Sequence, residues 1–188
     1  MPKRRVRRHE VIQPLDQSYR LIPLTQGQNA IVDTEDFERL TTRNWYASWN
    51  PCTESFYAFT WNGTLRRKQP LPDVVCNQDG PFDHQNRNTL DNRKENLRLC
   101  SKTENNRNRP PRQDCSSGFK GVGFDKRRHV WRARIIVNGV EMWLGYFDDP
   151  KEAARAYDEA AKLHHGEFAS LNFPVHEGIP KLPQSNGC

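Results

Sequence analysis

The sequence lacks any long apolar run. None of its 188 residues lies in a stretch approaching the ~20 apolar residues that span a bilayer, which excludes a membrane-spanning protein and a membrane partner. The N-terminus, Met1 to Arg8, also lacks the apolar segment of a secretion signal. We therefore expect the protein to stay in the cytoplasm.

Cysteine is scarce and shows no paired spacing. The chain has five cysteines, an odd number, and no two of them are spaced as Cys-x-x-Cys. This pattern excludes a zinc ribbon and a complete set of disulfides. Reduced structural thiols are the expectation for a cytosolic protein, and no motif indicates a nucleophilic cysteine.

Apolar residues are few and basic residues are in excess. Apolar residues make up 35% of the chain and the mean hydropathy is −0.96, so any core must be small. The net charge is +6, from 29 lysines and arginines against 23 aspartates and glutamates. The basic clusters are spread along the chain: Lys3–Arg8, Arg66–Lys68, Arg107–Arg112 and Lys126–Arg128. This distribution predicts a nucleic-acid partner, with solvated basic loops as the alternative.

The chain organisation predicts an α+β protein of two small domains. A pair of prolines, Pro110-Pro111, removes backbone donors and keeps the chain extended, so we place a linker there. The expected parts are a basic disordered tail (1–18), a β-rich first domain (19–107) with a core at about 74–107, a linker (108–116), a second domain (117–174) and a tail (175–188). We expect a monomer without a small-molecule cofactor.

Alternating and turn-forming residues define the second domain. Strands are expected at 119–124, 130–137 and 140–147, because Asn138-Gly139 is a strong two-residue hairpin signal. A helix should follow, with Asp149 as its N-cap and Pro150 in its first position. The result is a three-stranded antiparallel sheet packed on one helix, whose apolar stripe includes alanines, Tyr157 and Leu163.

The middle strand has one apolar and one cationic side. Ala133 and Ile135 share a face, while Arg132 and Arg134 point to the other side. In the third strand, Met142 and Leu144 should join the apolar side and leave Trp143 beside the arginines. An open sheet face of this kind matches a DNA major groove, so double-stranded DNA is the expected partner.

This domain resembles the plant ethylene-response-factor (Apetala-two) DNA-binding domain. The matching motifs are Gly121-Val122, Trp131–Ile135, Trp143–Gly145, Ala153-Ala154, Ala156–Asp158, Ala160-Ala161 and Leu171–Pro174. The resemblance implies that the sheet contacts duplex DNA. By position, the implied contacts are Lys120, Arg132, Arg134 and Trp143, with Lys126 and Arg127 in the first turn. Gly123 and Phe124 stand where the plant pattern has more arginine, so base specificity is not carried over.

The centre of the chain concentrates aspartate, histidine and asparagine. Phosphodiester hydrolysis needs a base for water and a metal that neutralises the leaving oxygen, and the adjacent Asp83 and His84 supply these two functions. Oxygen ligands from Asp83 and an asparagine suit Mg²⁺ better than zinc. Ser101 and Glu104 form a capping-box pattern, which places Asn105 early on a helix.

The surrounding residues are similar to the HNH homing endonucleases of the ββα-metal class. The motifs are Asp83-His84, Asn88, Leu90–Arg93, Glu95–Arg98 and Asn105-Asn106, and upstream Ile22–Gly27, Ala30–Asp33, Asp36–Leu40 and Trp45–Ala47. The resemblance implies Asp83 and Asn105 as ligands of Mg²⁺ (or Mn²⁺), His84 as general base and Asn96 as the residue that holds the loop. Arg93 and Arg98 would contact phosphate or form structural ion pairs.

One stretch departs from that family. Such proteins have a His-Arg pair in the strand before the Asp-His motif, whereas Gln69–Cys76 contains two prolines that interrupt a strand. The leading hypothesis is a metal-dependent homing endonuclease that cuts DNA in the nucleoid and is docked by its C-terminal sheet. The alternative is a DNA-binding transcriptional regulator whose HNH part has decayed.

Overall fold

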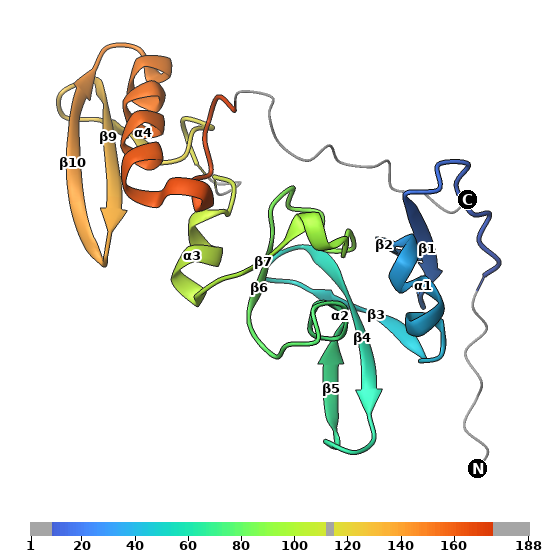
Figure 1. The fold of residues 1–188 in the computed structure, drawn as a ribbon. Helices are drawn as coiled ribbons and strands as arrows, with labels where there is room; N and C mark the ends of the chain where they lie inside the picture. The colour runs from blue at the N-terminus through green and yellow to red at the C-terminus, as the bar shows by residue number, and fades with distance from the viewer. Residues whose placement is uncertain (1–8, 112–114, 175–188) are drawn as a thin grey trace. The chain divides into compact units, whose positions relative to one another are not determined.

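The chain forms two units, which Figure 1 colours along the sequence. The computed structural model describes residues 9–111 and 115–174. The first unit extends to Cys100 and the second begins at Ser101. Their relative positions are not determined, so each is described by itself. Parts of the expected tails and linker, residues 1–8, 112–114 and 175–188, lie outside the described residues.

The first unit is β-rich, as expected. Its elements are β1 (Tyr19–Pro23), β2 (Asn29–Asp33), α1 (Thr34–Thr41), β3 (Trp45–Asn50), β4 (Ser55–Asn62), β5 (Arg67–Pro70), α2 (Leu71–Val75), β6 (Phe82–His84), the 3-10 turn η1 (Lys94–Asn96) and β7 (Leu97–Leu99). The strands form a β1-β2 pair, a three-stranded β3-β4-β5 sheet and a β6-β7 pair, all antiparallel. Strands β3 and β4 form a hairpin whose last paired residues are Asn50 and Ser55.

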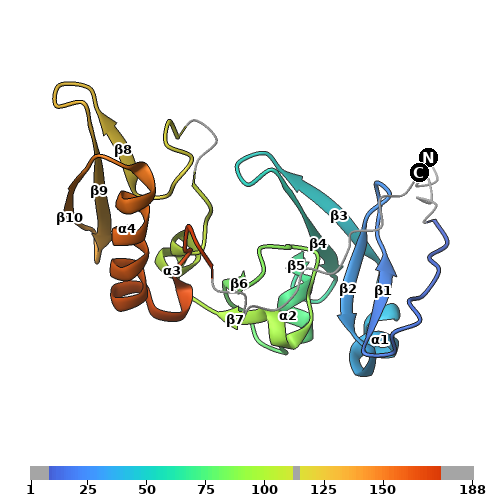
Figure 2. The same ribbon diagram turned by 90° about the horizontal axis from the view of Figure 1, so that it is seen from above.

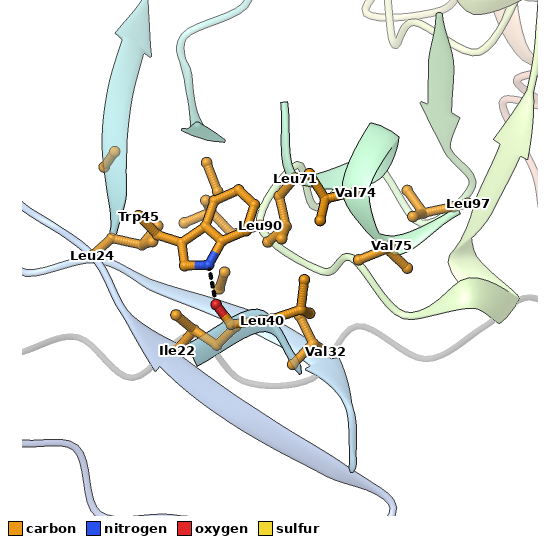
Figure 3. Packing of buried hydrophobic residues seen from close by; sticks show 13 residues of the cluster. Ile22, Leu24, Val32, Leu40, Trp45, Leu71, Val74, Val75, Leu90 and Leu97 are labelled. Atoms are coloured by element: carbon orange, nitrogen blue, oxygen red, sulfur yellow. Dashed lines mark hydrogen bonds between the residues drawn. The ribbon is translucent and has the colours of Figure 1, made fainter. Parts of the chain in front are cut away.

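The core of this unit surrounds one tryptophan. Trp45 is 1% exposed and its indole Nε1–H donates to the Leu40 carbonyl oxygen at 2.8 Å, the bond drawn in Figure 3. Aliphatic side chains from β1, β2, α1 and α2 pack around it. Because the indole nitrogen has a partner, this large ring is buried without an unsatisfied donor.

The stretch Gln69–Cys76 does not form an interrupted strand. Strand β5 ends at Pro70 and the chain turns at once into the short helix α2. Pro72 lies in the first turn of this helix, where its missing N–H has no helical partner to lose. The helix buries Leu71, Val74 and Val75 in the core, so the prolines reshape the segment instead of disrupting it.

The second unit contains the three-stranded sheet packed on a helix that the sequence predicts. Its elements are α3 (Lys102–Arg107), β8 (Val122–Asp125), β9 (Val130–Val137), β10 (Val140–Phe147), α4 (Pro150–His165) and the 3-10 turn η2 (Gly166–Phe168). The strand order is β10-β9-β8, all antiparallel, and α4 lies along one face (Figure 2). Asn138 and Gly139 have φ values of 51° and 82°, as the hairpin turn requires.

Two details of this unit correct the sequence analysis. Leu163 is 78% exposed, because the buried stripe of α4 follows Ala153, Tyr157 and Ala161 and passes beside it. In β10 a bulge between Trp143 and Gly145 adds one residue and reverses the inward and outward alternation beyond it.

The ββα-metal module is not shown. Strands β6 and β7 pair as that module requires, but α3, its expected helix, belongs to the second unit. The capping box that starts α3 is confirmed, since Ser101 and Glu104 exchange side chain-to-backbone hydrogen bonds. Within residues 9–111 and 115–174, no helix has the length and apolar character that crossing a bilayer requires.

Candidate nucleic-acid interface

The face of the β8-β9-β10 sheet opposite α4 gathers cationic and aromatic side chains. Trp143 lies directly across from Arg134 in the strand register, and Tyr146 lies across from Arg132. Directly paired residues of neighbouring strands point to the same side, so all four project away from the helix. Trp143 is 45% exposed and Tyr146 is 42% exposed. We call these four residues the outward patch.

Close helix packing on the other face keeps this patch open. Ala153, Ala154 and Ala161 are fully buried, and their small side chains let α4 approach the sheet. Gly121 makes the same approach possible from the sheet side. A Cβ there would lie 2.0 Å from Cδ2 of Tyr157, which packs against Ile135. The helix therefore covers the apolar face of the sheet and leaves the cationic face exposed to solvent.

Tyr146 is the member of the patch that sequence reasoning missed. Simple alternation from Met142 would turn it toward the helix, and the bulge turns it outward instead. Its ring lies 4.8 Å from that of Trp143 in an edge arrangement, and the Arg128 guanidinium sits 4.5 Å from its centroid. The signal in the sequence is Gly145, because a glycine inside a strand pattern marks a bulge; its φ is 134°.

The arginines of the patch differ in their neighbours. Arg134 pairs with Glu141 of the adjacent strand at 2.5 Å, and both side chains are about half exposed. The Nε of Arg132 is buried and has no hydrogen-bond partner among the described residues. A Cβ at Gly123 would lie 3.4 Å from this nitrogen, so the glycine leaves the space that the guanidinium occupies. Arg132 thus has donor capacity that the protein does not use.

The remaining predicted contacts of the second unit lie in two places. Lys126 and Arg127 are exposed in the β8-β9 turn, which is held by the Asp125 carboxylate accepting from the Arg127 and Arg128 amides. Lys120 is engaged elsewhere, because its ammonium donates to the carbonyl oxygens of Arg107 at 2.5 Å and Arg109 at 2.6 Å. Its contact with DNA stays a prediction, and these bonds favour a structural role.

The predicted metal ligand Asp83 and the predicted general base His84 are both buried in strand β6. The Asp83 carboxylate oxygen Oδ2 accepts from Nε and Nη2 of Arg98 at 2.9 and 2.6 Å. The His84 ring is 7% exposed and lies 3.3 Å from Oδ1 of Asn92. Burial lowers the pKa of His84, so the ring is neutral at pH 7.

The loop after His84 is a network of buried polar groups. Asp91, 0% exposed, accepts a bidentate pair of bonds from Arg93 at 2.9 and 2.8 Å, and Asn86 donates to it at 2.8 Å. Asn96 accepts from the Asn86 amide and donates to the Asp91 carbonyl. We call residues 84–96 with these bonds the polar loop. Asn96 thus connects two parts of this loop, and Arg93 and Arg98 form ion pairs.

A metal centre is not assembled by these side chains. The described parts of the chain contain no group of three His, Cys, Asp or Glu residues that could hold a metal ion. Asp83 is bound to Arg98, and Asn105 belongs to the other unit. These residues do not fit an ion, so we derive no step through one. The roles of Asp83, His84, Asn96 and Asn105, and Mg²⁺ or Mn²⁺ as cofactor, stay predictions.

Comparison with known proteins identifies the second unit. Residues 117–166 match the model of the AP2 domain family, and this part of the chain is an AP2 domain. The dehydration-responsive element-binding protein 2A of Arabidopsis thaliana is 43% identical over 70 residues, covering 35% of this chain and 19% of that protein. The AP2-like ethylene-responsive transcription factor TOE2, also from Arabidopsis thaliana, is 39% identical over 69 residues, covering 37% and 14%.

The similarity is confined to part of each relative. The ethylene-responsive transcription factor ERF015 of Arabidopsis thaliana is 33% identical over 91 residues, covering 41% of this chain and 48% of that protein. The chain thus spans less than half the length of each of these three relatives. No solved structure matches the chain.

These findings correct the leading hypothesis. The expectation of an HNH homing endonuclease is wrong: the matched family is the AP2 domain, and the relatives are transcription factors, not nucleases. The physical reason for the error is that aspartate, histidine and asparagine at close spacing also form a hydrogen-bonded loop. The prediction of an ethylene-response-factor domain in the C-terminal part is confirmed.

Proposed function

We propose that this chain is a DNA-binding transcriptional regulator whose AP2 domain binds double-stranded DNA with the outward patch. One observation supports this most strongly. The sheet face opposite α4 presents two arginines and two aromatic rings together, in the domain type that the transcription factors share with this chain. A monomeric state and a cytoplasmic, nucleoid-associated location stay predictions, while the proposal itself places the chain on chromosomal DNA.

The geometry suggests that different residues contact the bases and the phosphates of the duplex. A β-ribbon fits the major groove, where arginine side chains donate to guanine and aromatic rings contact thymine methyl groups. Arg134 is half exposed and can reach the groove, while the half-buried Arg132 adds positive charge on the same face. Lys126 and Arg127 at the end of the sheet would contact phosphate, which fixes register without reading sequence.

The test measures duplex binding by the full chain over a series of salt concentrations. The double variant Arg132→Ala/Arg134→Ala should weaken binding and, where both arginines release counterions, reduce the log–log salt slope by about 2. The matched control is Arg155→Ala/Lys162→Ala, which removes the same charge from the solvent side of α4. An equal loss in both double variants would contradict the proposal, because it would show attraction by net charge alone.

A further inference from the structure

The β3-β4-β5 sheet of the first unit packs one face on the core, and its other face points away from the core. Alternate positions of β3 and β4 are buried: Trp45 and Ala47 face the core, as do their neighbours Ala58 and Thr60. Because successive side chains of a strand point to opposite sides, the positions between them lie on the other face of the sheet. This face follows Tyr46, Tyr57, Phe59, Trp61 and Lys68.

Aromatic rings dominate this face, which we call the aromatic platform. Trp61 is 61% exposed, the most of any described tryptophan. Phe59 pairs with Tyr46 across the strands, and their rings lie roughly parallel at a centroid distance of 6.2 Å. Tyr57, Phe59 and Trp61 follow one another on β4 at every second position, which spaces them by about 7 Å. Tyr57 and Phe59 are half-buried, so Trp61 is the ring of this row that is most open to a ligand.

The charge around the platform is positive. Lys68 lies directly across from Trp61 in the register, and Arg66 is exposed in the turn that joins β4 to β5. The outward positions of these three described strands contain no carboxylate. The nearby Arg67 points to the other side, where it pairs with Asp79 at 2.5 Å. The platform therefore combines flat apolar rings with cations that have no acidic partner on the same face.

Single-stranded nucleic acid has the chemistry that matches this combination. Its unpaired bases present flat faces that stack on aromatic side chains, while its phosphates attract the surrounding cations. Duplex DNA does not offer these base faces, because its bases are stacked on one another. We propose that the aromatic platform binds single-stranded DNA by stacking, with Trp61 as the principal stacking residue and Lys68 as a phosphate contact. This surface is distinct from the outward patch.

The test uses the full 188-residue chain and a fluorescently labelled 12-nucleotide oligothymidylate. A uridine oligonucleotide of the same length is the comparison, and tighter binding of this RNA would contradict the assignment to DNA. Trp61→Ala should raise the dissociation constant roughly 5- to 100-fold, the range that removal of one stacking ring produces. Trp61→Phe, which keeps a ring, should restore most of the affinity. Lys68→Gln should lower the log–log salt slope by about 0.7, as the loss of one phosphate contact on a single strand predicts.

A tryptophan on the opposite side of the same sheet supplies the matched control. Trp49 is 49% exposed but lies on the core side, with its ring 4.9 Å from that of Phe56. Trp49→Ala should leave oligonucleotide binding unchanged. If Trp61→Ala binds as tightly as the wild type, or Trp49→Ala loses as much affinity, the platform does not stack bases and the inference is wrong.

The outcome is separable from that of the proposed function. The Arg132→Ala/Arg134→Ala variant should lose duplex binding and keep oligothymidylate binding, while Trp61→Ala should do the reverse. If each variant lost both activities, the inference of a separate surface for single strands would be wrong. Failure of the wild type to bind duplex, with oligothymidylate binding intact and sensitive to Trp61→Ala, would reject the proposed function and support the platform.

Discussion

The outward patch and the polar loop both contain arginines, but the two regions use them in opposite ways. In the patch, arginines and aromatic rings lie on an open sheet face, and Arg132 keeps a donor without a partner among the described residues. In the loop, Asp91, Arg93 and Asn96 are buried and bind each other. A polar cluster whose members bind one another supports the fold, whereas cationic and aromatic side chains left exposed on a sheet face can recognise a ligand.

The largest predicted effect concerns the paired charges of the polar loop. Asp91→Ala should lower the free energy of unfolding of the first unit by about 3–5 kcal/mol, because it removes the buried carboxylate that binds Arg93 and Asn86 and leaves Arg93 only the more exposed Glu95. Urea unfolding followed by tryptophan fluorescence measures this. The control Glu159→Ala breaks an exposed pair with Lys162 and should change stability by less than about 0.5 kcal/mol. Similar values for the two variants would refute the structural role of the loop.

The next prediction tests the close packing that leaves the patch open. Gly121→Ala should destabilise the second unit by about 2–4 kcal/mol, since the new Cβ would meet Tyr157 and the backbone has a φ of +76°. Thermal unfolding and duplex binding should both reveal the loss. Gly118→Ala is the matched control, because its φ is +69° but nothing lies within 4 Å of its Cβ position. It should lose only the conformational part, about 1 kcal/mol.

The third prediction concerns how a buried carboxyl group, that of Asp73, makes stability depend on pH. Asp73 in α2 is 5% exposed, and burial together with the nearby Asp79 charge raises its pKa to about 6. The folded state therefore holds this proton more tightly than the unfolded state does. The resulting stability is fully present below about pH 4 and is lost as the pH rises through 6.

The measurement compares urea unfolding at pH 4 and pH 7. The wild type should lose about 2 kcal/mol relative to Asp73→Asn over this interval, because the variant does not titrate there. Asp148→Asn, at an exposed position of the second unit, should follow the wild type. Parallel pH profiles for wild type and Asp73→Asn would show that Asp73 does not keep its proton in the fold.

The smallest predicted effect tests whether Arg134 of the outward patch contacts DNA. Glu141→Gln removes the carboxylate that pairs with Arg134 and should tighten duplex binding about two- to fivefold, as expected for an exposed ion pair and a lost repulsion of phosphate. Fluorescence anisotropy at constant salt measures this, with Glu159→Gln on α4 as the variant of equal charge change. Unchanged affinity in Glu141→Gln would indicate that Arg134 does not contact DNA.

Local signals made the second unit predictable. The alternation of Arg132, Ala133, Arg134 and Ile135, together with the Asn138-Gly139 turn, defines two strands without reference to the rest of the chain. The bulge at Gly145 was not predicted, because it depends on how Leu144 and Phe147 pack against the helix. The register places Arg134 and Trp143 side by side as the sequence predicts, and it adds Tyr146, which only the shifted register turns outward; the contacts with DNA stay predictions.

Non-local contacts made the central region unpredictable in function. Asp83 and Arg98 are 15 residues apart and meet only because β6 pairs with β7. The polar loop is also held from outside, since Ile31 of β2 exchanges backbone hydrogen bonds with Leu90 and Asn92. The spacing of these residues along the sequence does not reveal these contacts. Without the contacts, the same residue types suggest a catalytic site.

The amino-acid sequence by itself determined the strands, turns and helix of the AP2 domain, since period-two alternation, a hairpin dipeptide and a capped helix start act within a few residues. The tertiary structure alone decided which polar groups are free to act. Burial depends on segments far apart along the chain, and only the folded arrangement shows that the Asp91–Arg93 pair is buried in the core while Arg134 lies exposed on an open sheet face.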